Sequence, residues 1–211
     1  MIELAATSAD ELHRLQATLG HVRKLALLGP EGTWTHQAAL ELWPGTAVRC
    51  LFMPVAEMFA ALEQRMVDAV LLPARTSIVG DTPYMPVLQE LLMRDGVTPL
   101  ASYARMLGYC LLAKSAMPLH DVQRVLAHPV ALAEAAPWLD LRLPNALRVE
   151  CQSAGEAAQL VAQASDASSA SLGPALAGEL HGLIPLATGI EEGRHNVTEW
   201  WVVGRTAADT H

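Results

Sequence analysis

The chain has 211 residues, of which 52% are hydrophobic, and its formal net charge is -8 at pH 7. This length and composition allow a sizeable buried core, arranged as one domain or as two small lobes. The negative charge argues against nucleic acid and anionic membrane surfaces as partners, and no apolar run reaches the roughly 20 residues that a membrane helix needs.

Cysteine and histidine spacing gives no sign of a metal site. The cysteines Cys50, Cys110 and Cys151 lie singly in apolar runs, which fits neither a disulfide framework nor a metal-binding motif. The eight histidines show no ligand spacing either. The first residues are acidic and lack the basic and apolar regions of a secretory signal, so we expect a cytoplasmic protein.

The first half of the chain reads as alternating strands and helices. Ser-Ala-Asp-Glu at residues 8–11, followed by leucines on one stripe, predicts a helix to about residue 19 that serves in packing or dimerisation. An apolar run at 24–28 that stops at Gly-Pro predicts a buried parallel strand. The elements predicted next are a helix at 34–43, strand 47–52, helix 56–66, strand 67–72, a loop at 73–83, helix 84–94 and, beyond residues 98–104, strand 106–113. This order predicts a parallel sheet with right-handed crossovers.

A second α/β set follows in the other half. Its predicted elements are strand 122–127, helix 130–139, strand 147–151, helix 154–164, strand 167–172, a short helix opened by Gly173-Pro174, and a final strand at 197–203.

The junction at residues 29–35 has the features of a small anion site. Thr33 or Thr35 can accept the first free amides of the following helix. Gly32 has no Cβ that would keep a ligand away from exposed N–H groups at a helix N-terminus. No glycine-rich nucleotide motif is present.

Several segments carry a resemblance to one family. Residues 28–36, Leu-Gly-Pro-Glu-Gly-Thr-Trp-Thr-His, resemble the opening Leu-Gly-Pro-x-Gly-Thr-Phe-Ser-His motif of prephenate dehydratases. The similarity continues to about residue 205 through Leu72-Pro73, Gly80, Ala127-His128-Pro129, Ser171-Leu172-Gly173 and Asn196-Val197-Thr198.

The resemblance implies an α/β fold of the two-lobed, type II periplasmic-binding-protein kind, with the active cleft between the lobes. The implied organisation is an N-terminal helix at 1–23, a dehydratase-like domain at 24–205 and a tail at 206–211. Lobe 1 would comprise about 24–100 plus 190–205, and lobe 2 about 101–189. Because the chain ends soon after the last predicted strand, the phenylalanine-binding regulatory domain of many family members is not expected.

Two family motifs are altered in this chain. The family loop Pro-Ile-Glu-Asn-Ser/Thr is here Pro73-Ala74-Arg75-Thr76-Ser77, and the late Thr-Arg-Phe is here Thr198-Glu199-Trp200. A glutamate has thus become Arg75 and an arginine has become Glu199. One interpretation is a structural salt bridge with reversed polarity, worth about 1 kcal/mol if exposed. The other is altered substrate chemistry.

The preferred hypothesis is non-aromatising decarboxylation of prephenate to dihydro-4-hydroxyphenylpyruvate, similar to bacilysin-type antibiotic and secondary-metabolite biosynthesis. A protonated Glu199 would donate the proton, and Arg75 with the helix amides at Thr33 and Trp34 would hold the carboxylates. The remaining predicted contacts with the substrate are the polar side chains Thr76, Ser77, Asn196 and Thr198, and Trp200 as an apolar wall.

Two alternatives stay open. One is an ordinary prephenate dehydratase of phenylalanine biosynthesis with a rearranged site, in which Arg75 replaces the lost arginine. The other is a non-catalytic ligand-binding module on the same scaffold. The resemblance implies neither metal nor organic cofactor, because prephenate is already poised to lose CO2. It also implies a homodimer or a higher homo-oligomer.

Overall fold

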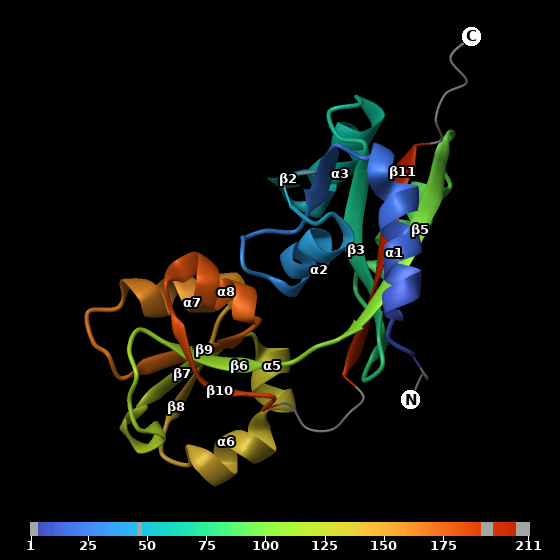
Figure 1. The fold of residues 1–211 in the computed structure, drawn as a ribbon. Coiled ribbons are helices and arrows are strands. Elements are labelled where there is room, and N and C mark those ends of the chain that lie inside the picture. The colour runs from blue at the N-terminus through green and yellow to red at the C-terminus, as the bar shows by residue number, and fades with distance from the viewer. Residues whose placement is uncertain (1–3, 46–47, 191–195, 206–211) are drawn as a thin grey trace. The chain divides into compact units, whose positions relative to one another are not determined.

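The computed structural model describes residues 4–45, 48–190 and 196–205, and the chain divides into two compact units (Figure 1). Unit 1 comprises residues 1–29, 38–106 and 195–211, and unit 2 comprises residues 30–37 and 107–194. Each unit contains one β-sheet with helices, so the fold is α/β. The division into a 1–23 helix, a 24–205 domain and a tail remains a proposal, and the tail lies outside the described residues.

Unit 1 is built on a six-stranded mixed sheet of order β2-β1-β3-β11-β5, with β4 paired to β3. Its elements are α1 (Ala9–Thr18), a 3-10 turn (Leu19–His21), β1 (Lys24–Leu27), the later part of α2 (Trp34–Leu42), β2 (Arg49–Phe52), α3 (Val55–Glu63), β3 (Ala69–Thr76), β4 (Gly80–Asp81), α4 (Met85–Leu92), β5 (Val97–Met106) and β11 (Val197–Arg205). Strand β1 pairs in parallel with β2 and β3, which confirms the predicted parallel strands. Strand β11 is antiparallel to β3 and to β5.

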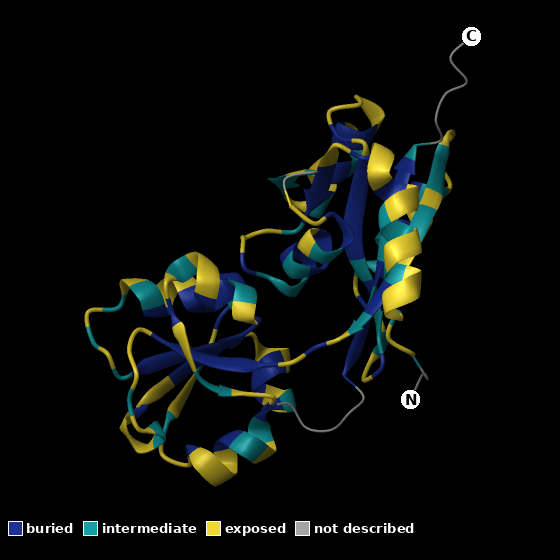
Figure 2. Cartoon of the chain, in the orientation of Figure 1, coloured by how far each residue is buried: buried dark blue, intermediate teal, exposed yellow. Residues whose placement is uncertain are grey.

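The strands β1 and β3 of this sheet are largely buried (Figure 2). On one face, Met58 and Leu62 of α3 and Leu88 of α4 pack in one core cluster with strand residues of β1, β3 and β11. On the other face, Glu41 of α2 bonds to side chains of β5. Helix α1 begins at the N-cap Ser8, whose Oγ accepts the amide of Glu11 at 3.3 Å, as the sequence predicted.

Unit 2 has a five-stranded sheet of order β10-β6-β9-β7-β8. Its elements are β6 (Cys110–Ala113), a 3-10 turn (Leu119–Asp121), β7 (Arg124–Ala127), α5 (Pro129–Glu134), α6 (Ala136–Arg142), β8 (Leu147–Glu150), α7 (Ala154–Gln163), β9 (Ser169–Gly173), α8 (Ala175–His181) and β10 (Ile184–Thr188). Strand β7 is parallel to β8 and β9, whereas β6 is antiparallel to both of its neighbours. One core cluster includes side chains of α5 and α6, and another includes side chains of α7 and α8.

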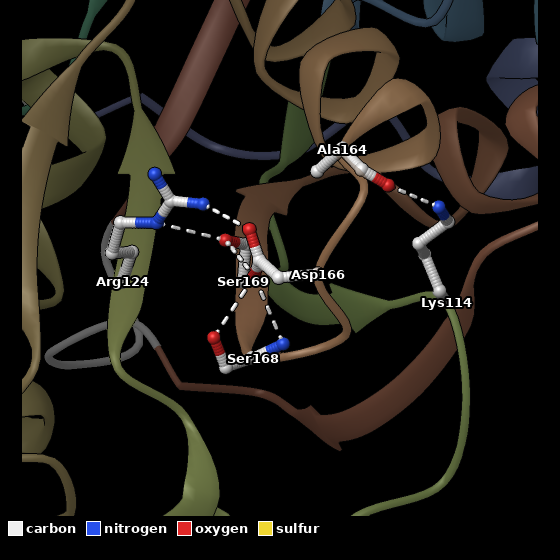
Figure 3. A network of polar contacts seen from close by, with 6 residues as sticks. All are labelled: Lys114, Arg124, Ala164, Asp166, Ser168 and Ser169. Carbon is white, nitrogen blue, oxygen red and sulfur yellow. Dashed lines mark hydrogen bonds and ion pairs between the residues drawn. The ribbon is translucent and has the colours of Figure 1, made fainter.

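A polar network anchors the turn between α7 and β9 (Figure 3). Asp166 Oδ1 accepts from the amide of Ser168 at 3.1 Å, from Ser168 Oγ at 2.9 Å and from Ser169 Oγ at 3.1 Å, while Arg124 pairs with Oδ2. These hydrogen bonds, led by that from Ser168 Oγ, lower the pKa of Asp166. Lys114 donates to the carbonyl of Ala164 at the other end of the turn.

Several predicted boundaries are wrong. The predicted loop at 73–83 is the end of β3, a turn and the short strand β4, and these strands pair through Arg75 with Asp81 and Thr76 with Gly80. The predicted strand at 106–113 is two strands, since β5 ends at Met106 and β6 begins at Cys110. The predicted helix at 130–139 divides at Ala135, where α5 ends and α6 begins with Pro137 in its first turn. Strand β10 was not predicted.

Candidate functional site

The two altered motif positions face each other in the sheet of unit 1. Glu199 on β11 pairs in register with Arg75 on β3, and Arg75 Nη1 lies 4.0 Å from Glu199 Oε2. The side chain of Arg75 is 38% exposed and that of Glu199 is 15% exposed. The chain therefore has an ion pair of reversed polarity where the family pattern has glutamate and arginine.

Further contacts hold the two charged side chains in place. Ser102 Oγ on β5 donates to Glu199 Oε1 at 2.6 Å. Glu199 Oε2 is buried and, among the described residues, has no hydrogen-bond partner beyond the ion pair with Arg75. Arg75 Nε donates to Asp81 Oδ1 at 2.9 Å, and its guanidinium lies 5.7 Å from the ring centroid of Trp201, within cation–π range. The charged pair is thus positioned by three neighbouring strands.

The predicted threonines, Thr76 and Thr198, project from the face of the sheet opposite to Arg75 and Glu199. Thr198 pairs in register with Thr76, one residue from the Glu199–Arg75 pair. Since successive residues of a strand point to opposite faces, Thr76 and Thr198 share one face, and Arg75 and Glu199 share the other. Thr198 is 5% exposed, and Thr76 Oγ1 accepts the amide of Val79 at 3.1 Å. The structure thus separates Arg75 from the threonines with which the sequence grouped it.

The other predicted residues of unit 1 have structural partners. The Oγ of Ser77 accepts the amide of Val197 at 2.9 Å, and the Ser77 amide donates to the Val197 carbonyl, also at 2.9 Å. Asn196 is 3% exposed. Trp200 is 1% exposed and stacks on Tyr103 with a centroid separation of 6.4 Å. This burial favours a core role for Trp200 over a ligand-facing wall.

Sequence reasoning missed a charged group on the threonine face. Arg105 on β5 pairs in register with Thr198, and its Nη1 lies 3.0 Å from Glu41 Oε1. Tyr103, two residues earlier on β5, donates to Glu41 Oε2. Burial, together with the hydrogen bond and the charge of Glu41, raises the pKa of Tyr103, so its hydroxyl remains a donor. In the sequence, the joint contact of Tyr103 and Arg105 with Glu41 is indicated only by their two-residue spacing, which places both side chains on one face of a strand.

The predicted anion site lies in unit 2 and is partly occupied by the chain itself. The Gly32 amide donates to His36 Nδ1 at 3.2 Å, and the His36 amide donates to Thr33 Oγ1, also at 3.2 Å. A Cβ on Gly32, which has φ +78°, would lie 3.2 Å from Ala177 Cα, so the glycine makes room for packing. The capping role predicted for Thr33 is confirmed, and the Gly32 amide has a partner within the chain, His36.

Two aromatic residues of unit 2 lead from this junction to an acidic side chain. Trp34, at the start of α2, packs edge-to-face on Tyr109 with the ring centroids 5.6 Å apart. The Tyr109 hydroxyl donates to Glu134 Oε2 at 2.7 Å. Burial lowers the pKa of the neighbouring His36 below its ordinary value of 6.5, against the opposing charge of Glu31. Thr33 and Trp34 thus belong to unit 2, whereas the other predicted site residues belong to unit 1.

Two surface hollows lie in unit 2, away from the predicted residues. One has a volume of about 390 Å³ and is bordered by Arg124, Asp166 and Ser169. The other has a volume of about 450 Å³ and is bordered by His128, Cys151 and Glu156. Across residues 4–45, 48–190 and 196–205, no group of three or more histidine, cysteine or acidic side chains could hold a metal ion. Within those ranges, none of the helices is long and apolar enough to span a bilayer.

Comparison with known proteins gives a consistent match. The prephenate dehydratase family model matches residues 25–208. The bifunctional chorismate mutase/prephenate dehydratase of Neisseria gonorrhoeae is 32% identical over 181 residues, which are 85% of this chain and 49% of that protein. The prephenate dehydratase of Mycolicibacterium gilvum is 32% identical over 194 residues, covering 85% of this chain and 60% of that one. This chain therefore spans only about half to three fifths of these relatives.

A solved structure agrees with the sequence match. Prephenate dehydratase from Arthrobacter aurescens, in complex with L-Phe, superposes with a TM-score of 0.75 at 26% identity, over 88% of this chain and 61% of that one. The family model alone covers most of the described sequence, from β1 to the end of β11. The chain belongs to the prephenate dehydratase family.

Proposed function

We propose that this chain decarboxylates prephenate without forming an aromatic ring. Breaking the bond between the ring carbon and its carboxylate releases CO2 and leaves an electron pair delocalised over the ring. A dehydratase uses this pair to expel the ring hydroxyl as water, which gives phenylpyruvate. The proposed reaction instead adds a proton to a ring carbon, so the hydroxyl is retained in dihydro-4-hydroxyphenylpyruvate. Each route consumes one proton per turnover.

The observation that supports this proposal is the side chain at position 199. The family pattern has arginine there, whereas this chain has Glu199, held by Ser102 and paired with Arg75. A guanidinium stabilises negative charge on a departing hydroxide, and a carboxylate does not. Without this stabilisation in the transition state, expulsion of the hydroxyl slows and protonation of a ring carbon competes.

The proposal assigns three residues to the chemistry. Thr198 bonds a substrate oxygen directly. Glu199 and Arg75 project from the opposite face of the sheet, so their proposed parts are indirect: a protonated Glu199 is the source of the proton that reaches the ring through solvent, and Arg75 pairs with the carboxylate that remains. The remaining proposed substrate contacts are Thr33, Trp34, Thr76, Ser77, Asn196 and Trp200. For Ser77 and Trp200, their existing partners in unit 1 favour an indirect, supporting part.

Product analysis with prephenate tests the proposal. Purified protein is incubated with prephenate, released CO2 is measured, and proton NMR distinguishes retained ring alkene and carbinol signals from aromatic signals. A reaction without protein corrects for spontaneous decay, and Glu199→Gln serves as the site variant. CO2 release with retained alkene signals supports the proposal. Phenylpyruvate as the sole product would overturn it.

Prephenate dehydration is the second candidate, because relatives that are 32% identical carry that name. In this case, expression of the chain should restore growth of a phenylalanine auxotroph that lacks its own dehydratase. Failure to restore growth while folded protein is present would count against this candidate.

The wider setting of the reaction is also part of the proposal. A product that keeps its hydroxyl is not a direct phenylalanine precursor, which suits antibiotic or other secondary-metabolite biosynthesis. We propose a homodimer or a higher homo-oligomer as the working form, which light scattering of the purified protein at several concentrations would test.

A further inference from the structure

Strand register places a second arginine beside the predicted hydroxyl residues. On β11, Thr198 pairs with Thr76 of β3 on one side and with Arg105 of β5 on the other. Directly paired residues of antiparallel strands project from the same face, so these three side chains form one row across the sheet. Arg75 and Glu199 occupy the next row and project from the opposite face. Arg105, and not Arg75, is the basic residue in the row of the threonines.

This row lies at the end of the sheet where ligands bind in open α/β folds. It is one pair away from Val197 and Met106, the last register pair of β11 and β5. The parallel strand β3 also ends here, at Thr76. Carboxyl ends of parallel strands are the usual location of ligand sites in such sheets. The side chain of Arg105 is 23% exposed, so it is neither sealed in the core nor fully in solvent.

Glu41 and Tyr103 hold the Arg105 guanidinium in a defined position. Arg105 Nη1 pairs with one oxygen of Glu41, and the hydroxyl of the buried Tyr103 donates to the other oxygen. A guanidinium has five N–H donors in a planar fork, so it binds two carboxylates at once through different edges. Fixing the fork in advance reduces the entropy that a ligand must offset when it binds.

We propose that Arg105 binds a carboxylate of the small ring diacid, next to Thr198 on the threonine face of the sheet. This inference rests on the proposed function for the choice of substrate. It assigns Arg105 to the carboxylate and not to the ring hydroxyl, because the hydroxyl is retained in the proposed reaction. The competing interpretation is that Arg105 only links β5 to α2 through Glu41.

Four variants separate the two interpretations. Arg105→Gln removes the charge, and Arg105→Lys keeps it but loses the fork. Glu41→Gln breaks the same ion pair while leaving Arg105 in place. Arg94→Gln is a matched control, because Arg94 pairs with Glu63 elsewhere in unit 1. For each variant, the KM and kcat for prephenate, the melting temperature and the equilibrium binding of prephenate by rapid dialysis are measured.

A substrate-binding role changes KM more than stability. Losing a charge-assisted hydrogen-bonded pair raises KM and the dissociation constant about 10- to 100-fold in Arg105→Gln. Arg105→Lys raises KM by less than Arg105→Gln does, since a lysine keeps the charge without bidentate geometry. Arg94→Gln leaves the KM within about twofold. Glu41→Gln raises the KM less than Arg105→Gln does, because it releases the guanidinium without removing its charge, and it lowers the melting temperature as much as Arg105→Gln does.

The possible results distinguish this inference from the proposed function. If Arg105→Gln raises the KM no more than Glu41→Gln does, Arg105 is structural and the inference fails, whatever the product. If the wild type makes only phenylpyruvate but Arg105→Gln still weakens binding, the proposed function fails and the Arg105 site stands. If the wild type does not bind prephenate by dialysis, both are overturned.

Discussion

Reversing the charges at positions 75 and 199 tests the central pair directly. The variants are Arg75→Glu, Glu199→Arg and the double change, which restores the polarity of the family pattern. At 4.0 Å, two unit charges interact by about 4 kcal/mol at an effective dielectric constant of 20. Because Arg75 is 38% exposed and also binds Asp81, solvent screening reduces the pair to about 0.5 kcal/mol.

Charge reversal multiplies this small energy in a double-mutant cycle. Each single variant turns one attraction into a repulsion, and the double variant recovers the attraction, so the coupling is about four times the pair energy, or about 2 kcal/mol. The interaction of residue 75 with Asp81 changes in the same way in both halves of the cycle and cancels. For a chain of this size, 2 kcal/mol corresponds to about 4–8 °C in melting temperature.

The assay combines chemical denaturation of all four proteins with NMR analysis of their products from prephenate. We expect the double variant to be more stable than the sum of the singles indicates, and to shift the product toward phenylpyruvate. Reversing the exposed pair of Arg94 and Glu63 controls for general charge effects. A coupling near zero would refute the ion pair. An unchanged product ratio in a folded double variant would remove position 199 from the choice of product.

Three further expectations concern unit 2 and the core. Gly155→Ala should lower the free energy of unfolding by at least about 1–3 kcal/mol, since a Cβ there would lie 2.1 Å from the Glu31 carbonyl oxygen. Gly20→Ala, which has open space around it, should be close to neutral. Urea titration measures both variants. Trp200→Ala should cost about 3–5 kcal/mol by the same measurement, and a loss under 1 kcal/mol would contradict its burial. Burial lowers the pKa of His36, so the unfolded chain protonates this side chain more readily than the folded chain does. The free energy of unfolding should therefore fall as pH drops below 6.5. His36→Gln should make this dependence on pH less steep.

The parallel strands could be predicted because their sequence signal is local. Apolar runs that stop at Gly or Pro indicated β1, β3 and β7, and the pairing of β1 with β3 and of β7 with β9 is parallel. The cap at Ser8 and the cap at Thr33 were also readable, because each depends on residues within one helical turn. These features require no knowledge of distant parts of the chain.

The extension of β3 past Pro73 could not be predicted from local rules. Proline usually ends or avoids a central strand, because it has no N–H for the ladder. Here the register with β1 ends at Leu71, and the β11 register shifts between Glu199 and Trp200, which leaves Ala74 as the extra residue of a bulge. Pro73 is tolerated because it falls beside this irregularity and beyond the last partner on β1.

The sequence identified most residues of the candidate site, but not the face of the sheet from which each one projects. Residues 75 and 199 were identified as a pair from their exchanged charges, and the register confirms that they face each other. The faces from which Arg75 and the threonines project could not be predicted, because the face a side chain occupies depends on strand parity after the bulge. Arg105 has no motif of its own, and only its pairing with Thr198 across two distant strands brings it to attention.

The central position of β11 has a consequence for synthesis on the ribosome. Strands β3 and β5 both pair with β11, yet ninety residues, 107–196, separate β5 from β11 along the chain. Until residues 197–205 emerge, the nascent chain presents two unpaired strand edges, which invite association with other chains. Most of unit 2 is contiguous and is translated in that interval, so it can fold first, while unit 1 waits for its last central strand.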